Sequence, residues 1–325
     1  MLLAFLFSLS SGVSDLGATE IIRILFNNST PELLKDIFFQ FRLPKTFTAI
    51  LAGMALSVSG LLMQTLFRNP LAGPYVLGIT GGSNLMVALL VMGTTAAEIQ
   101  FTSVVNNIAV PVSAAIGALI ALFFILLISI KVHSSVSLLL AGLMLGFIYG
   151  SIQNILEFLA SPEAIKRFTL WSMGSLGNVS IHQLFLLSLF VLPGFLFAFF
   201  LSKQLDVFML GDDYSTSLGI NLNFFRWSVV LVTALLTGVV VAYCGPIAFI
   251  GLAVPHLTRM IWLTPHHRIL VPATAITGAT LLLLCDGLGN MFSNHFVIPI
   301  NIVTSLIGAP FVLYLLFRNT TFQFG

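Results

Sequence analysis

Few residues in this 325-residue chain have the types and spacing that catalysis or ligand binding requires. All five lysines lack a preceding glycine, which excludes a Walker A phosphate loop and hydrolysis of ATP by that route. The six histidines lack metal-ligand spacing, and the chain has neither an H-E-x-x-H zinc pair nor a G-x-S-x-G nucleophile elbow. The sequence therefore predicts no catalytic site, no metal site and no cofactor. We interpret His256, which follows Pro255, as a hydrogen-bonded packing residue.

Two acidic residues, Glu157 and Asp286, are the candidates for handling ions inside a membrane. Ionisable groups at that depth are costly and commonly serve proton or sodium coupling. Each of the two lies near the end of an expected span, where a structural hydrogen bond explains its presence better than ion coupling does. We therefore expect uphill transport to draw its energy from elsewhere, and ion-coupled secondary transport is the alternative.

The composition is that of a membrane protein with many spans. Apolar residues make up 58% of the chain and charged residues 7%, with a mean hydropathy of +1.07, whereas about a quarter of the residues of a soluble domain are charged. The net charge is +2 and no basic run occurs, so nothing points to nucleic acid as a partner. The lipid bilayer is the expected surroundings.

The charge-free windows predict an all-α polytopic membrane protein, a single transmembrane domain over residues 1–325 with about ten spans. The apolar start, 1–9, is too short to span, so the first helix is expected to be truncated. Residues 15–41 are expected to form an exposed connection with a short amphipathic helix. A capped helix outside the bilayer is expected over 162–173. The later spans are expected at about 44–67, 83–97, 108–130, 137–159, 183–201, twice within 227–258, and at 269–288 and 299–317.

The stretch from Arg42 to Gly82 is the most informative. Its 22 residues from Thr46 to Phe67 carry no charge, which is enough for a helix to cross a hydrocarbon core of ~30 Å. Asn69-Pro70-Leu71 and four glycines between 73 and 82 then favour irregular backbone. Lipid cannot satisfy such backbone, so protein or a water-filled cavity must cover it. This pattern indicates a conduit.

The distribution of cations predicts the orientation. If the Arg68 end of this span is cytoplasmic, that side holds seven cations against three aspartates, as the positive-inside rule requires. Residues 203–226 then face the cytoplasm, while Arg42 and Lys45 face outward. Within 203–226, Asp212-Asp213 can cap a helix ending at Gly219, and Asn221 can start a second short one. A plain surface loop is the alternative on local pattern alone.

Several motifs together resemble the FecCD-type permeases, which are membrane subunits of bacterial ATP-binding-cassette (ABC) importers for iron siderophores, haem and vitamin B12. The motifs are RLPK at 42–45, SGLLMQTLFRNPLAGPYVLGITGG at 59–82, LLLAGLMLG at 138–146, WSMGSLG at 171–177, LGDDYSTSLGIN at 210–221, GPIAFIGLAVPHLTRM at 245–260 and IVTSLIGAPFVLYLL at 302–316. The resemblance implies a ten-helix subunit in the bacterial cytoplasmic (inner) membrane. It also implies three kinds of partner: a second permease copy, expected to form a homodimer, two cytoplasmic ATPase subunits, and a periplasmic or lipid-anchored binding protein.

The resemblance also implies roles for particular residues. Arg42 and Lys45 would dock the binding protein, although Lys45 stands where arginine is common and Asn290 where some members carry another outward cation. The cytoplasmic gate would comprise Asn69, Pro70, Leu71, Ser135 and Val136. The loop at about 206–226 would form the coupling helices that contact the ATPase, through Leu210, Gly211, Asp212, Asp213, Ser217, Leu218, Gly219 and Asn221.

We expect ATP-driven import by alternating access, with an iron chelate as the first candidate substrate and cobalamin or haem next. Small and weakly polar residues of the span at 44–67 are expected to line the translocation path. These are Ser57, Ser59, Gly60, Met63 and Gln64. The alternative for this face is helix packing through small residues.

Overall fold

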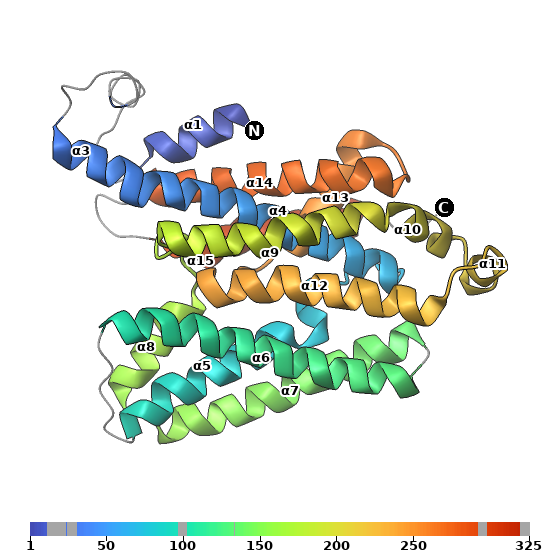
Figure 1. Ribbon diagram of the computed structural model, residues 1–325, viewed down its shortest axis with the longest axis horizontal. Coiled ribbons are helices and arrows are strands. Elements are labelled where there is room, and N and C mark those ends of the chain that lie inside the picture. The colour runs from blue at the N-terminus through green and yellow to red at the C-terminus, as the bar shows by residue number, and fades with distance from the viewer. Residues whose placement is uncertain (12–23, 25–30, 97–102, 133, 292–297, 319–325) are drawn as a thin grey trace.

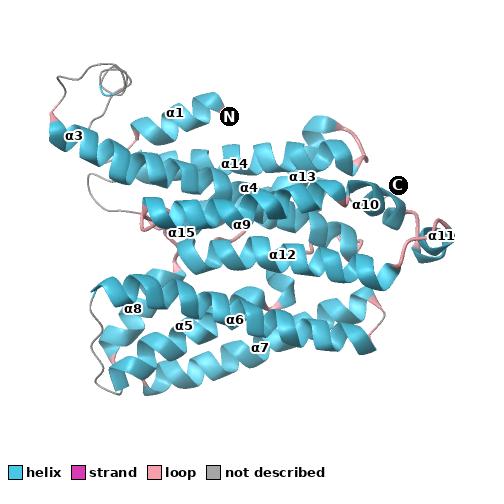
Figure 2. Cartoon of the chain, in the orientation of Figure 1, coloured by secondary structure: helices cyan, strands magenta, loops and turns pink. Residues whose placement is uncertain are grey.

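The computed structural model describes residues 1–11, 24, 31–96, 103–132, 134–291 and 298–318. These residues form helices joined by turns, with no strand among them (Figure 2). In chain order the elements are α1 (Leu2–Ser10), α3 (Glu32–Asp36), η1 (Ile37–Arg42), α4 (Leu43–Leu66), η2 (Pro74–Leu77), α5 (Ile79–Ala96), α6 (Ser103–Lys131), α7 (Ser135–Leu159), α8 (Pro162–Ser172), α9 (Ile181–Phe200), α10 (Ser202–Met209), α11 (Asp212–Ser217), α12 (Leu222–Cys244), α13 (Ile250–Trp262), α14 (His267–Met291) and α15 (Ile300–Arg318).

Six helices within the described ranges are long and apolar enough to cross a membrane, namely Glu32–Leu66, Ile108–Lys131, Val136–Leu159, Ile181–Phe200, Leu222–Cys244 and His267–Met291. Two shorter apolar helices, Ile79–Gly93 and Ile300–Tyr314, accompany them. The predicted all-helical polytopic membrane protein is thus confirmed, while these lengths do not confirm a count of ten spans.

The second expected span begins earlier than its apolar pattern suggests. Residues from Glu32 onward continue without a break into α4, so 32–41 extend the helix of this span instead of forming a separate connection, although most of them are exposed, as expected. Most of the remaining part of that expected connection, 15–23 and 25–30, lies outside the described residues. The π-helical segment η1 lies directly before Pro44. Because proline lacks a backbone N–H, a helix that continues through one needs a local change in hydrogen bonding, which a π turn can provide.

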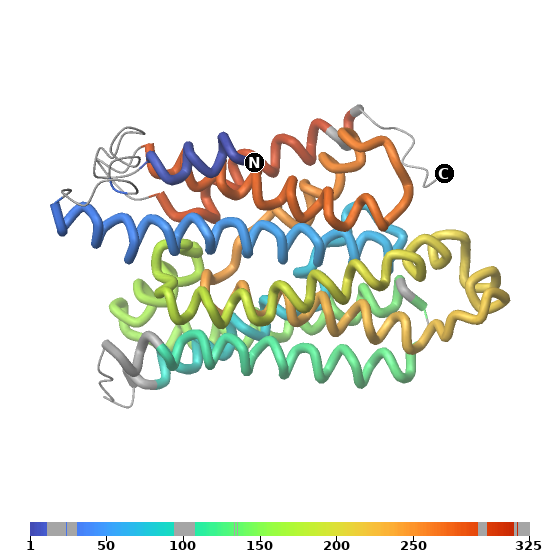
Figure 3. The backbone as a smooth tube through the Cα atoms, turned by 45° about the horizontal axis from the view of Figure 1, so that its top comes forward, coloured from blue at the N-terminus to red at the C-terminus, as the bar shows by residue number. Residues whose placement is uncertain are grey.

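Helix α4 is the centre of the fold. It packs against α14, α12, α13 and α9, and lies between α14 and α9 in Figure 3. Two glycine pairs allow the closest approaches: a Cβ atom on Gly53 would collide with the backbone of Gly278, and one on Gly60 with the backbone of Gly251. Bare backbone at these points lets the helices pack without side chains between them.

Helices α5, α6, α7 and α8 form a second group, which contacts the first through α12 (Figure 1). Helix α8 matches the short helix expected over 162–173, and the Ser161 hydroxyl caps it by accepting from the N–H of Ala164 at 3.4 Å. Helices α10 and α11 protrude at one end of the bundle, beside the start of α12. The cation distribution predicts that this is the cytoplasmic end.

Candidate functional site

Arg68, two residues after the end of α4, occupies the centre of a polar cluster at the end of the bundle where α10 and α11 protrude. Its Nη2 donates to Asp212 Oδ1 at 2.6 Å and to the Phe208 carbonyl at 2.7 Å. The guanidinium also lies 4.5 Å from the centroid of the Phe208 ring, within the range of a cation–π contact. The backbone of Arg68 is left-handed, with φ 45°, an uncommon conformation for a residue other than glycine. The contacts with α10 and α11 hold it there.

The carboxylate of Asp212 joins three elements. Its second oxygen, Oδ2, accepts from Nη2 of Arg226 in the first turns of α12 at 2.8 Å. Asp212 therefore connects the first residue of α11 to the end of α4 and to the beginning of α12. Two aromatic rings next to these charged residues also connect α10 and α12: those of Phe208 and Phe225 pack with centroids 4.8 Å apart. We call Arg68, Phe208, Asp212, Phe225 and Arg226 the coupling cluster.

The turn after Arg68 contains three of the predicted gate residues. The Asn69 side chain accepts from the N–H of Leu71 at 2.9 Å, which closes a local turn, and the Pro70 carbonyl lies 2.7 Å from His256 Nε2 on α13. The interpretation of His256 as a hydrogen-bonded packing residue is thus confirmed. The other two gate candidates, Ser135 and Val136, lie in the first turn of α7, where Val136 is exposed.

The segment predicted to couple to an ATPase forms the tip of the α10–α11 protrusion. Gly211 and Gly219 have φ +118° and +83° on either side of α11, so both turns use backbone conformations that favour glycine. Leu210, Tyr214 and Leu218 are exposed. Asp213 is exposed too, and the hydroxyls of Thr216 and Ser217 donate to its backbone carbonyl. This tip offers an apolar surface to a partner.

The sequence predicted that Asn221 starts a second short helix, and this prediction is wrong. The Asn221 side chain accepts from the N–H of Phe224 at 3.1 Å and caps the long helix α12. The extra short helix of this region is instead α10, which follows α9 after Leu201. Hydropathy cannot separate these possibilities, because the same Asn cap begins a short helix or a long one.

A second connection ties the protrusion to the bundle. Asp206 Oδ1 on α10 accepts from the backbone N–H of His267 at 2.8 Å and lies 2.6 Å from its ring Nδ1, while the other ring nitrogen lies 2.9 Å from the Thr65 hydroxyl on α4. Burial alone would raise the pKa of Asp206, but the two hydrogen bonds from His267 and the attraction to His267 and His266 together lower it. The carboxylate is therefore held in its charged form.

The five residues expected to line the path do not reach an open surface in this conformation. Ser57, Ser59, Met63 and Gln64 are fully buried, and Gly60 packs against Gly251. The Ser57 hydroxyl lies 3.0 Å from the carbonyl of Thr274, and the Gln64 amide donates to the Leu252 carbonyl at 3.1 Å. The packing alternative explains this face, because small residues serve close helix contact as well as they serve a cavity.

The two predicted docking cations are also engaged inside the chain. Arg42 is buried and donates to the carbonyls of Leu9 and Ser10 at 2.8 and 3.2 Å, so it does not present a free cation outward. Lys45 forms an ion pair with Asp286 at 3.0 Å and donates to Asn290 Oδ1 at 2.6 Å. Asparagine at 290 thus has a structural partner in this chain.

The two membrane carboxylates have structural partners, as the sequence predicted. Asp286 accepts from the Ser8 hydroxyl at 2.8 Å in addition to its pairing with Lys45, and Glu157 accepts from Gln153 at 2.8 Å, one helical turn earlier. The sequence missed the roles of Arg68, Arg226 and Phe208. The available signals were Arg68 at the end of one apolar stretch and Arg226 at the start of another, 14 residues after Asp212.

Long apolar helices around a buried central helix, with short helices and a structured turn at one end, define a polytopic membrane permease. The family model of the FecCD transport family matches residues 1–318, and the chain belongs to this family. Members of the family are permease subunits of ABC transporters.

Relatives and solved structures agree with this assignment. The hemin transport system permease protein HmuU of Yersinia pestis is 36% identical over 320 residues, which cover 98% of this chain and 94% of that protein. The vitamin B12 import system permease protein BtuC of Escherichia coli is 34% identical over 319 residues, which cover 98% and 92%. A solved structure of an inward-facing conformation of a metal-chelate type ABC transporter aligns with a TM-score of 0.84 at 28% identity, over 98% of this chain and 97% of that chain.

Proposed function

We propose that this chain is the permease subunit of an ATP-driven importer that carries a metal chelate across the bacterial cytoplasmic membrane. Haem, ferric siderophores and cobalamin are the candidate substrates, since the names of the relatives point to haem and vitamin B12. Energy would come from separate ATPase subunits, because the sequence has no Walker A loop of its own. A binding protein outside the membrane and a second permease copy would complete the importer.

The observation that carries this proposal is the bridge from Arg68 to Asp212. The ATPase would contact the exposed tip around Leu210, Tyr214 and Leu218. A displacement of α11 acts on Asp212, and through Arg68 it reaches the turn at 69–71. Charge-assisted hydrogen bonds are directional, so the bridge would transmit movement in both directions between the ATPase and the gate. The predicted roles of Ser135 and Val136 in the gate rest on their place at the same end of the bundle.

The exposed face of α7 is the better candidate for lining the path. Ser137, Met144, Ser151 and Asn154 are exposed, and their spacing of seven, seven and three residues places them on one helix face. The Ser151 hydroxyl donates to the Phe147 carbonyl within the helix, but lipid would offer no partner to the Asn154 amide, whereas a water-filled path would solvate it. A second copy placed against α7 would enclose this face along the axis of a dimer.

Docking of a binding protein would rest on Lys45 more than on Arg42. The Lys45 side chain is 25% exposed and can share its charge between Asp286 and an acidic partner. Rim charges of this kind mainly affect orientation and association rate.

Affinity purification of the tagged chain from its native cells tests the proposal. We expect an ATPase subunit to copurify, and ATP hydrolysis by the reconstituted complex to rise when a binding protein loaded with haem, ferric siderophore or cobalamin is added. Uptake that persists without the ATPase and collapses when a proton uncoupler is added would instead establish the secondary-transport alternative.

A further inference from the structure

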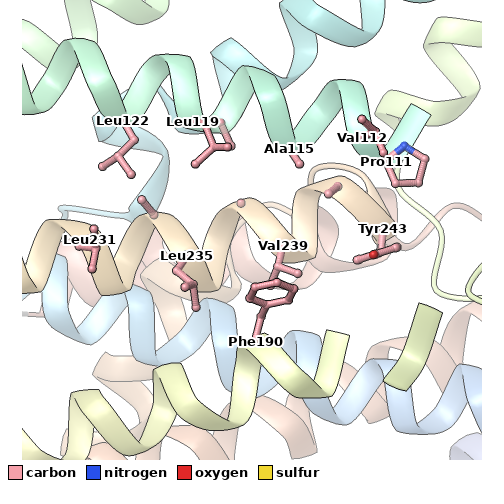
Figure 4. Close-up of a pocket in the computed structure, with 14 residues that line it drawn as sticks. Pro111, Val112, Ala115, Leu119, Leu122, Phe190, Leu231, Leu235, Val239 and Tyr243 are labelled. Carbon is pink, nitrogen blue, oxygen red and sulfur yellow. The ribbon is translucent and has the colours of Figure 1, made fainter. Parts of the chain in front are cut away.

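Helix α12 ends at the end of the bundle opposite α10 and α11, which the cation distribution predicts to face outward (Figure 1). Tyr243 in its last turn lines a hollow between α6 and α12 together with Pro111 of α6 (Figure 4). The chain then leaves the helix, and residues 245–249 connect α12 to α13 without helical structure. This segment packs against the turn after α8, residues 173–177. We call the two segments the outer junction.

The two segments of the outer junction meet backbone on backbone. Gly174 has φ +73° and Gly245 has φ +70°, both in the left-handed region. A Cβ atom on Gly174 would lie 2.8 Å from the carbonyl oxygen of Pro246. The N–H of Ser175 also donates to the carbonyl of Cys244 at 2.8 Å. Because glycine permits both the conformation and the close approach, a displacement of one segment acts directly on the other.

Asn301, at the start of α15, ties the outer junction together. Its backbone N–H donates to the Met173 carbonyl at 3.2 Å, and its side-chain Oδ1 accepts from the N–H of Ala248 at 2.9 Å. The next residue, Phe249, has φ +66°, an uncommon conformation for a bulky residue, which its surroundings must hold. A Cβ atom on Gly308 of α15 would collide with the Phe249 side chain. The first turns of α15 therefore hold the segment from which α13 begins.

Helix α13 leads from the outer junction to the cytoplasmic gate turn at 69–71. Phe249 is the residue directly before its first turn. Further along, the ring Nε2 of His256 lies 2.7 Å from the Pro70 carbonyl, and Nη1 of Arg259 donates to Gln64 Oε1 on α4 at 2.7 Å. The same helix thus contacts the outer junction at its beginning and the gate turn in its second half.

The candidate docking cation Lys45 touches the other side of the outer junction. A Cβ atom on Gly177 would lie 3.7 Å from Lys45 Cδ, which is van der Waals contact. The Lys45 side chain is 25% exposed, so a partner that binds it comes within reach of the turn at 173–177.

We propose that the outer junction transmits the docking of a binding protein to the cytoplasmic gate turn, with Asn301 as the positioning residue and α13 as the connecting element. The inference rests on the proposed function, because it requires a binding protein that docks at Lys45. A displacement of the turn at 173–177 acts on Asn301 through Met173 and reaches α13 through Ala248. Short non-helical segments between helices absorb such changes while the helices keep their shape.

Helix α4 offers a rival route, since it also runs from Lys45 to the gate turn. It is the buried centre of the bundle, and its backbone contacts at Gly53 and Gly60 leave no room for it to shift without separating its neighbours. The backbone of 245–249 has no helical hydrogen bonds that would resist a change. The two routes make different predictions for Asn301, which belongs to the first route only.

Labelling of Leu71→Cys with a polar maleimide tests the proposal, because Leu71 is 42% exposed whereas the natural Cys244 and Cys285 are buried. The importer would be held in nanodiscs, with and without the loaded binding protein that raises its ATP hydrolysis. We expect docking to change the labelling rate about fivefold, the lower end of ordinary coupling between sites. With Asn301→Ala added, docking should leave the rate unchanged, although the variant still binds the partner and melts cooperatively.

Two further variants separate transmission from a general loss of structure. Asn301→Asp keeps the oxygen that accepts from Ala248 and should keep the response. Ser305→Ala, one turn further along α15, is the control, because the Ser305 side chain forms no hydrogen bond within the described part of the chain. Asn301→Ser, which is too short to reach Ala248, replaces Asn301→Ala if that variant does not fold.

Three results would overturn the proposal. A response that survives in Asn301→Ala would assign the transmission to α4. A response lost equally in Asn301→Asp or Ser305→Ala would show that the hydrogen bond to Ala248 is not its cause. No response in the unmodified importer would show that docking does not reach the gate turn. If no binding protein raises ATP hydrolysis, the proposed function fails and this inference fails with it, whereas once one does, the labelling alone decides the inference.

Discussion

Arg68 and Asp212 form a 2.6 Å ion pair although 144 residues separate them in the sequence. Arg68 follows the buried central helix α4, and Asp212 begins the short protruding helix α11. Since Asp212 also pairs with Arg226, the coupling cluster joins α4, α11 and α12 through one carboxylate. The following predictions test what these contacts and the helix packing around α4 contribute.

Asp212→Asn should lower the stability of the cytoplasmic end by about 1–3 kcal/mol, because it removes the charged acceptor that Arg68 and the nearly buried Arg226 share. Hydrogen exchange of α11 and the first turns of α12 should therefore become faster. Asp213→Asn is the matched control, since the neighbouring Asp213 carboxylate is exposed at the surface. Equal exchange in both variants would show that the bridge contributes nothing.

Gly219→Ala should strain the turn after α11 by about 1–2 kcal/mol, because φ is +83° and an L residue pays that penalty in the left-handed region. We expect the chain to remain in the membrane while ATP-dependent uptake by the assembled importer is lost. Thr216→Ala at an exposed position of α11 keeps a helical backbone and serves as the control. Full uptake by Gly219→Ala would contradict a coupling role for this turn.

Gly60→Ala should destabilise the bundle by about 1–3 kcal/mol, because the new methyl group meets the backbone of Gly251 and the helices must separate. Gly150→Ala on α7, where nothing lies within 4 Å of the added Cβ, should change the melting temperature little. If Gly60→Ala melted like Gly150→Ala, the tight packing of this face would be refuted, and a cavity at this position would regain support.

Lys45→Met should cost about 3–5 kcal/mol, because it leaves the buried Asp286 carboxylate without its cation. The double variant Lys45→Met with Asp286→Leu should recover much of this loss, which a double-mutant cycle of thermal unfolding would measure. A purely docking role for Lys45 predicts normal stability in the single variant and weaker association with the binding protein.

Asp206 should make the folding stability of the chain depend on pH in the acid range. Its folded pKa is lowered, so its contribution is fully present above the ordinary carboxyl pKa and disappears as pH falls through the folded value. The melting temperatures of the unmodified chain and of Asp206→Asn should thus differ at neutral pH and converge once the pH has fallen below the folded pKa of Asp206. A difference that persisted unchanged in acid would mean that His267 is held by other contacts.

Hydropathy predicted the membrane helices well where an apolar run is bounded by a charge or by a Gly-Pro pair, as for α12, whose apolar run lies between Arg226 and Gly245-Pro246. It failed at the start of α4, because Glu32 and Lys35 look like loop residues although they continue the helix. Ser57 and Gln64 were ambiguous for a physical reason, since small and weakly polar side chains suit both a wet cavity and close helix contact.

The coupling cluster could be predicted only in part. The Asp212 motif and the glycines around α11 are local features, so the sequence indicated a short helix there. The partners of Asp212 depend on how α4, α11 and α12 meet at one end of the bundle. Likewise, a cation near the outer end of a span looks available for docking, and only the fold shows that Arg42 caps the carbonyls of Leu9 and Ser10.

The ratio of substrate transported to ATP hydrolysed tests the central claim most directly. Proteoliposomes containing the importer with Asp212→Asn would be compared with proteoliposomes containing the unmodified importer, with both quantities measured in the same vesicles. We predict that Asp212→Asn still hydrolyses ATP but transports about tenfold less per ATP, as expected when a coupling of 1–3 kcal/mol is lost. A ratio equal to that of the unmodified importer would contradict transmission from α11 to the gate through Asp212 and Arg68.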